Sequence, residues 1–267
     1  MGEGASSVVV PVGDGGYGVV ATSGMPVSYE QRLARAAELQ RVYPAAREIL
    51  EFYSTLARFQ KRIFEEVSAR GETRVESLAG YFPDFLNVLW RAGPAGLAET
   101  GARIADPAVL LEQCWSGELP DDWFFGRALV QPFAESLAAR GQIDVGEAVV
   151  DCPFCGARPA VAVRRGEGDG AKRSLVCSLC STEWTFRRIL CPNCGEEDKN
   201  KLPVYAAKDF AHVCVEACDA CGHYIKAVDL TVDGRAVPLV DEIATLALNI
   251  WAEEHGYSKI VPNVVGM

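Results

Sequence analysis

The sequence predicts an α+β protein with an N-terminal all-α helical domain, two tandem metal-binding ribbons of short β-strands, and a C-terminal helix. Three observations support this prediction. In the first half of the 267 residues, apolar side chains recur at three- and four-residue steps, which is the period of an amphipathic helix. After Gly141 the pattern changes to short alternating β segments. Nine of the ten cysteines lie within residues 152–221, so the two halves have different architectures.

The composition excludes several classes of protein. With 49% hydrophobic residues the chain can bury a core, and no apolar run approaches the length of a membrane span. A net charge of −10 argues against a protein that coats nucleic acid or anionic lipid. The acidic, glycine-rich start lacks the basic and apolar regions of a secretory signal. We therefore expect a cytoplasmic protein without stable membrane insertion, in which clustered thiols are metal ligands rather than disulfides.

The helical domain is predicted over residues 28–148, after a mobile tail over 1–27 that is rich in glycine, serine and valine. Its first helix runs from about Ser28 to Val42, and a longer one begins near Pro44 and ends at Gly71. Three further helical stretches are predicted at Phe85 to Arg91, Pro107 to Trp115 and Trp123 to Arg140. Successive helices with short breaks are typical of an all-α bundle.

The two ribbons are predicted over residues 149–188 and 189–234. In the first, alternating apolar residues begin at Val161, a glycine-rich turn follows, and the last strand carries Trp184. The second ribbon repeats this order, with strands at Val204 to Tyr205, Val213 to Val215 and Tyr224 to Leu230. Residues 235–267 are predicted to form one C-terminal helix, ending near His255, and a tail.

Four C-x-x-C pairs are the most specific chemical signal, namely Cys152/Cys155, Cys177/Cys180, Cys191/Cys194 and Cys218/Cys221. A C-x-x-C turn directs both sulfurs toward one point, and two such turns make a tetrahedral site with four thiolate ligands. Three turns have glycine after the second cysteine, where a left-handed residue lets an amide reach a thiolate. The fourth turn has Ser181 at that position, which is a departure from the pattern.

The intervals between the pairs decide which turns combine. There are 21 residues between Cys155 and Cys177 and 23 between Cys194 and Cys218, and each interval is long enough for a β-hairpin. Only ten residues separate Cys180 from Cys191, which is enough for a single strand. Sequential pairing therefore gives one site in each ribbon, whereas an interleaved pairing would leave the hairpins unconnected.

The expected cofactors are two metal ions per chain, either iron or zinc, because a tetrahedral site of four sulfurs suits both metals. Two cysteines remain outside the pairs. Cys114 is expected to be a small buried hydrophobic residue of the helical domain. Cys214 is expected to be a strand residue near the second site, and the alternatives are a substitute ligand or a thiol that resolves an oxidised neighbour.

The charge of the ribbons limits what they bind. Residues 151–232 contain eleven Lys or Arg and eleven Asp or Glu, so the block is neutral overall. A ribbon that reads DNA or RNA is expected to show a basic footprint. The sequence also contains no glycine-rich phosphate loop and no nucleophile–histidine–acid set that we can identify. We therefore expect neither a nucleic-acid partner nor an enzyme.

The ribbon motifs resemble the formate dehydrogenase accessory protein FdhE family. The resemblance rests on Cys177-Ser178-Leu179-Cys180 with Thr182-Glu183-Trp184, on Cys191-Pro192-x-Cys194-Gly195, and on Cys218-Asp219-x-Cys221 with Tyr224-Ile225-Lys226. The closing segment, Ala244-Thr245-Leu246-Ala247-Leu248 with Gly256-Tyr257 and Asn263, is also similar to that family. The match is dense over residues 150–263 and looser in the helical half. The extra Cys214 and Ala217 depart from the family pattern.

The resemblance implies a cytoplasmic bacterial protein that binds the molybdenum- or tungsten-containing catalytic subunit of respiratory formate dehydrogenase before that subunit is exported. It also implies a rubredoxin-like fold for the ribbons. The motif residues that do not bind metal are then the candidates for contacting this client, namely Thr182, Glu183, Trp184, Asp219, Tyr224 and Lys226. For Trp184 and Tyr224, packing within the ribbon is an equal alternative.

Three functional classes follow from the sequence. An assembly factor is favoured by the motif strings. A rubredoxin-like electron carrier is the alternative, although the long helical half is not needed for electron transfer. A nucleic-acid-binding zinc ribbon comes last because of the neutral charge. No oligomeric state is predicted.

Overall fold

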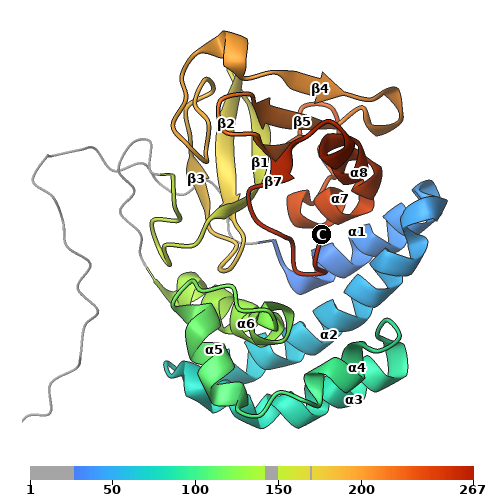
Figure 1. Ribbon diagram of the computed structural model, residues 1–267, viewed down its shortest axis with the longest axis vertical. Helices are drawn as coiled ribbons and strands as arrows, with labels where there is room; N and C mark the ends of the chain where they lie inside the picture. The colour runs from blue at the N-terminus through green and yellow to red at the C-terminus, as the bar shows by residue number, and fades with distance from the viewer. Residues whose placement is uncertain (1–26, 142–149, 169) are drawn as a thin grey trace, which may run out of the picture.

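The computed structural model describes residues 27–141, 150–168 and 170–267 (Figure 1). Almost all of the predicted tail, 1–26, lies outside these residues. A helical region comes first along the chain, a sheet with two groups of four cysteines follows, and helices close the chain. The predicted α+β class and its order of parts are therefore confirmed.

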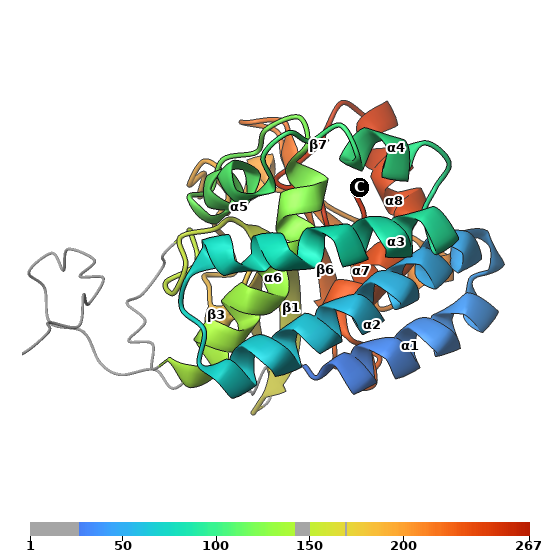
Figure 2. The same cartoon turned by 90° about the horizontal axis from the view of Figure 1, so that it is seen from below.

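Within residues 27–141, the helical region contains six α-helices. These are α1 (Tyr29–Val42), α2 (Arg47–Arg70), α3 (Phe82–Ala92), α4 (Leu97–Gly101), α5 (Pro107–Trp115) and α6 (Trp123–Arg140). Helix α1 begins with a capping box, in which Gln31 N donates to Ser28 Oγ and Ser28 N donates to Gln31 Oε1. Helix α2 ends at Gly71, whose left-handed φ of 63° closes the last turn. Seen from the helical end, α3 crosses in front of α6 (Figure 2).

Within the described residues, the six strands of the two ribbons and one short strand of the C-terminal segment form a single seven-stranded sheet. Its strands are β1 (Pro159–Glu167), β2 (Gly170–Cys177), β3 (Glu183–Thr185), β4 (Val204–Ala206), β5 (Val213–Cys218), β6 (His223–Asp229) and β7 (Ser258–Lys259). The order is β3-β2-β1-β6-β5-β4, with β7 beside β6. Within each ribbon the pairs are antiparallel, but β1 and β6 run parallel, with Val161 opposite Lys226. This parallel pair connects the ribbons, and the sequence did not predict it.

The single predicted C-terminal helix is wrong in one respect, because the structure has two helices, α7 (Pro238–Ala244) and α8 (Leu246–Glu254). They are separated at Thr245, whose φ of −98° and ψ of 40° leave the helical range. Lys226 Nζ, from the sheet, donates to Glu242 O and to Thr245 O. The carbonyls that a continuous helix would use are therefore bonded to a lysine, and the helix breaks there.

One hydrophobic core connects the helical region with the first ribbon. It contains Phe59 and Phe85 from the helices together with Leu175 and Trp184 from the ribbon. The opposite sheet face packs against α7 and α8 through Val161, Val215 and Leu248. Helix α7 lies between the sheet and α1 (Figure 1). Among the described residues, no helix has both the length and the apolar character needed to cross a bilayer.

Candidate metal centres

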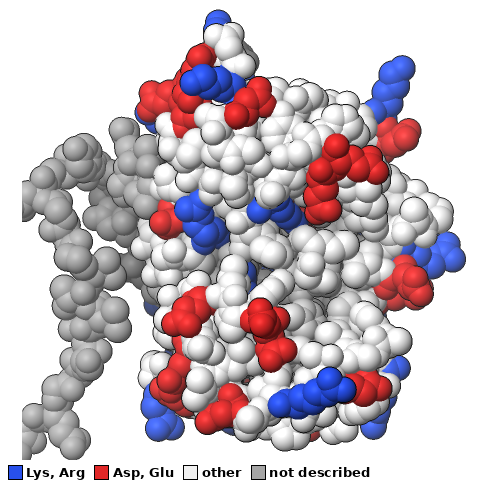
Figure 3. Space-filling view, in the orientation of Figure 1, with Lys and Arg blue, Asp and Glu red and all other residues white. Residues whose placement is uncertain are grey.

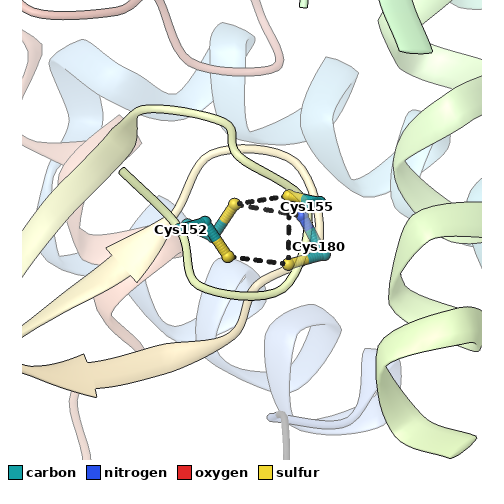
Figure 4. A group of neighbouring side chains, drawn as sticks. Cys152, Cys155 and Cys180 are labelled. Atoms are coloured by element: carbon teal, nitrogen blue, oxygen red, sulfur yellow. Dashed lines mark hydrogen bonds between the residues drawn. The ribbon is translucent and has the colours of Figure 1, made fainter. Parts of the chain in front are cut away.

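The first group of cysteines forms where two turns face each other at the end of the β1–β2 hairpin. Cys152 and Cys155 precede β1, and Cys177 and Cys180 follow from the end of β2. Cys152 Sγ lies 3.5 Å from Cys180 Sγ, and Cys155 Sγ lies 3.4 Å from Cys177 Sγ. The sulfurs labelled in Figure 4 point toward one another. Three of the four cysteines are buried, and Cys155 is half-buried.

The second group repeats this arrangement in the other ribbon. Cys191 Sγ lies 3.8 Å from Cys221 Sγ, and Cys194 Sγ lies 3.7 Å from Cys218 Sγ. A tetrahedral ion with metal–sulfur bonds of about 2.3 Å requires sulfurs that are about 3.8 Å apart. Both groups are close to this spacing, and in each of them all four sulfurs lie within 4.8 Å of one another. The two groups of four cysteines are therefore two candidate sites for a tetrahedral ion, as the sequential pairing of the turns predicts.

The backbone of each turn aims its amides at the sulfurs. Leu179 N donates to Cys177 Sγ at 3.3 Å, and Asn193 N donates to Cys191 Sγ at 3.4 Å. Gly156, Gly195 and Gly222 have φ values of 74°, 77° and 68°, the left-handed conformation that favours glycine. Ser181 adopts the same conformation with a φ of 58°, and it is the only non-glycine residue among the described ones to do so.

The donor set of the first site is suited to a cation. Burial raises the pKa of the Cys177 thiol, and hydrogen bonding with Cys152 and Cys155 raises that of Cys180. Four thiolates therefore cannot share this volume unless a positive ion balances them, and metal binding supplies such an ion. The residues fit a divalent metal, and the distances do not distinguish iron from zinc.

The two sites differ in exposure. At the second site Cys194 is exposed and Cys221 is half-buried, whereas the first site has no exposed ligand. A cavity of about 540 Å³, which the sequence did not predict, opens beside the second site. Cys191 and Cys218 line it together with Arg188 and Ile189.

The cysteines outside the pairs do not join either group. Cys114 is buried in the helical region, and burial raises its pKa to about 11. Cys214 lies buried on β5, and burial likewise raises its pKa to about 11. Both side chains are therefore protonated near neutral pH, as expected for packed thiols.

The six predicted client-contact residues do not share one surface. Trp184 and Tyr224 are buried in the sheet, and Lys226 is fully buried in an ion pair with Glu242 at 2.9 Å. Thr182 is buried too, with its Oγ1 3.1 Å from Cys180 Sγ. In this conformation these four residues contribute to packing.

The other two predicted contact residues are more accessible. Glu183 is half-buried and accepts hydrogen bonds from Arg165 Nη2 at 2.7 Å and from Ser174 Oγ at 2.5 Å. Asp219 is exposed beside the second site, and its Oδ1 accepts from Tyr257 OH at 2.6 Å. Asp219 is thus the most accessible of the six.

Two family models match adjoining segments in the second half of the chain. Residues 151–188 match the central domain of FdhE, and residues 189–265 match the C-terminal domain of FdhE. The Protein FdhE homolog of Aquifex aeolicus is 27% identical over 269 residues, which cover 89% of this chain and 95% of that protein. The chain belongs to the FdhE family. The resemblance seen in the ribbon motifs is therefore confirmed.

Other FdhE proteins are similar to this chain over only part of their own length. The homolog from Edwardsiella ictaluri is 35% identical over 126 residues, and the match spans 41% of that protein. The crystal structure of the FdhE protein from Pseudomonas aeruginosa superimposes with a TM-score of 0.66 at 23% identity, covering 89% of this chain and 95% of that one. This similarity shows that the fold is shared along nearly the whole chain.

Proposed function

We propose that this FdhE-family protein is a cytoplasmic assembly factor that binds the catalytic subunit of formate dehydrogenase and helps it to mature. The observation that carries the proposal is the pair of four-cysteine sites on one continuous sheet, in a chain of this family. Recognition of a large client needs a broad, rigid surface rather than a deep pocket. A sheet joined across both ribbons and cross-linked by two metals offers such a surface. The proposal assigns no catalysis to the chain.

Each site is proposed to hold one iron or zinc ion. Bound metal would neutralise the thiolates and cross-link the two turns of a ribbon, and iron would add one-electron redox chemistry. Cys152, Cys155, Cys177 and Cys180 would hold the first ion, and Cys191, Cys194, Cys218 and Cys221 the second. Elemental analysis of protein purified without oxygen tests this assignment, and fewer than two metals per chain would contradict it.

The client surface is proposed to include Asp219, because it is exposed beside the more open metal site. Basic and acidic side chains are mixed over the face in Figure 3, and no extended basic stripe suited to nucleic acid is visible on it. Replacing Asp219 removes a carboxylate that anchors Tyr257 at the surface, with no buried charge left behind. The folded protein is therefore expected to survive the change.

Capture of the client by tagged protein tests the proposal. Wild-type protein is expected to retain the dehydrogenase catalytic subunit from a lysate that contains it, and D219A to retain at least tenfold less with its metal content unchanged. Glu99→Ala, a substitution of an exposed carboxylate on α4, is the matched control and is expected to behave as wild type. If the wild-type protein captures no subunit, the assembly role is wrong. If wild-type protein captures the subunit and D219A retains as much of it as wild type does, the contact lies elsewhere on the surface.

One observation favours the alternative of an electron carrier. Cys194 is exposed, so a metal in the second site would lie close to the surface, where electrons can enter and leave. An anaerobic preparation that is coloured and bleaches reversibly with reductant would support this function. A colourless zinc protein that still captures the client would exclude it.

A further inference from the structure

A buried polar stripe on α6 faces the first metal site. Arg127, Gln131 and Glu135 are spaced four residues apart on this mostly apolar helix, so they lie on one face. Their exposed fractions are only 8%, 6% and 2%. Two of them reach the turn that carries Cys177 and Cys180, since Arg127 Nη2 donates to Ser178 O at 2.9 Å and Glu135 Oε1 accepts from Ser181 Oγ at 2.5 Å.

Arg127 is a buried cation without a carboxylate partner among the described residues. Its guanidinium lies over the Trp123 ring, 5.8 Å from the ring centroid, and donates a hydrogen bond to Ser178 O. Glu118 lines the same cavity of about 190 Å³, but it accepts a hydrogen bond from Ser116 Oγ rather than pairing with Arg127. A buried guanidinium stays protonated, so its charge requires compensation nearby.

The neighbours of this charge are sulfurs. Cys114 and Cys155 line the same cavity as Arg127, and Cys177 directly precedes Ser178, whose carbonyl oxygen accepts the hydrogen bond from Arg127. Of these three, Cys177 and Cys155 belong to the first site. Four thiolates around a divalent ion keep a net charge of about −2, and this charge is buried here. We propose that Arg127 is the counter-ion of the first four-cysteine site and that it controls how firmly this site retains a divalent metal.

The turn is also held at its other end. Ser181 occupies the position at which the other three turns have glycine, although a left-handed φ is unfavourable for serine. Its hydroxyl donates to Glu135, which is paired with Arg32 of α1 at 2.9 Å, and Arg32 Nη2 lies 3.3 Å from the same hydroxyl. The contact to α1 and α6 explains the serine. The first site and the helical region therefore form one unit, whereas an exposed ligand opens the second site to water.

Metal release from the full-length, zinc-loaded protein tests the role of Arg127. Excess chromogenic chelator is expected to remove the two ions in two phases, the faster from the exposed second site. Cys194→Ser assigns this phase, because it removes one exposed ligand of that site. Arg127→Gln keeps a donor for Ser178 O but removes the charge, and it is expected to speed the slow phase at least tenfold while the fast phase is unchanged.

Two further variants separate charge from packing. Arg127→Lys keeps the charge and is expected to stay within about threefold of wild type in the slow phase. Arg140→Met, a loss of arginine at the end of the same helix, is the control and is expected to leave both phases unchanged. If Arg127→Gln releases metal at the wild-type rate while its circular dichroism is native, the proposal is wrong. The proposal is also wrong if Arg127→Lys releases metal in the slow phase as fast as Arg127→Gln does.

A second measurement does not depend on release rates. A positive charge beside the site favours the more negative ferrous form over the ferric form. In iron-loaded protein, Arg127→Gln is therefore expected to lower the midpoint potential of the first site and to leave that of the second site unchanged. Arg127→Met also removes the charge and is expected to have the same effect, so it replaces Arg127→Gln if that variant does not fold. Equal potentials in wild type and both neutral variants would overturn the counter-ion assignment. The proposal does not depend on client binding, so its failure would leave the assembly role intact.

Discussion

Replacing Glu242 by glutamine should destabilise the protein strongly. The Glu242 carboxylate is buried. It forms ion pairs with Lys226 Nζ at 2.9 Å and with Lys259 Nζ at 2.5 Å, and it accepts a hydrogen bond from Asn263 Nδ2 at 2.7 Å. Lys226 has no solvent-exposed surface, so removing its partner leaves a buried unpaired charge. Breaking a buried ion pair on one side costs about 3–5 kcal/mol, against a total stability of about 5–15 kcal/mol. We expect Glu242→Gln to lose about that amount.

The double variant distinguishes this reasoning from a simple packing defect. Lys226→Met alone leaves Glu242 with Lys259, whereas Lys226→Met/Glu242→Gln leaves neither buried charge of the pair. The double variant should therefore be less destabilised than the sum of the single variants by at least about 1 kcal/mol. Urea unfolding at fixed metal saturation measures all four free energies. A Glu242→Gln loss below about 1 kcal/mol, or strictly additive losses, would refute the ion-pair account.

Three more outcomes are expected. Burial raises the pKa of Glu242, but the charges of Lys226 and Lys259 outweigh this effect and hold the pKa at about 2. The stability of the protein should therefore fall as the pH drops from about 4.5 toward 2. Acid titration of Glu242→Gln should show a weaker decline in stability than titration of the wild type. Chelation should expose the second ribbon to protease before the first, and mass spectrometry of early fragments checks whether cuts fall between Cys191 and Cys221. Cys152→Ser should lower the melting temperature more than Cys191→Ser does, because the first metal site shares a hydrophobic core with the helices. Equal melting temperatures of the two variants would contradict a coupling between the first site and the helical region.

The local elements could be predicted from the sequence because their signals are local. Helices α5 and α6 begin and end at the predicted residues, since apolar periodicity and flanking Pro and Gly fix them. The grouping of the eight cysteines into two sites followed from the number of residues between the C-x-x-C pairs, because a hairpin must fit between the two turns of each site. Each of these predictions depends on residues that are close in sequence.

The arrangement between distant segments could not be predicted in the same way. Nothing near Val161 or Lys226 indicates that β1 and β6 pair in parallel across 65 positions of the sequence. Lys226 reads as a surface residue, and only the fold supplies the carboxylate and carbonyls that let it be buried and that divide α7 from α8. The sequence does carry one signal of a buried polar contact, because a spacing of i, i+4 and i+8 places Arg127, Gln131 and Glu135 on one face of a mostly apolar helix.

The sheet ends on both sides in very short strands, β3 and β4, with three residues each. An edge strand exposes unpaired backbone groups that can template the addition of a foreign strand, and long flat edges therefore promote aggregation. Three residues offer little length for such templating. A chain proposed to handle a partly matured enzyme subunit would meet unfolded segments repeatedly, and its blunt sheet edges would protect it from indiscriminate strand capture.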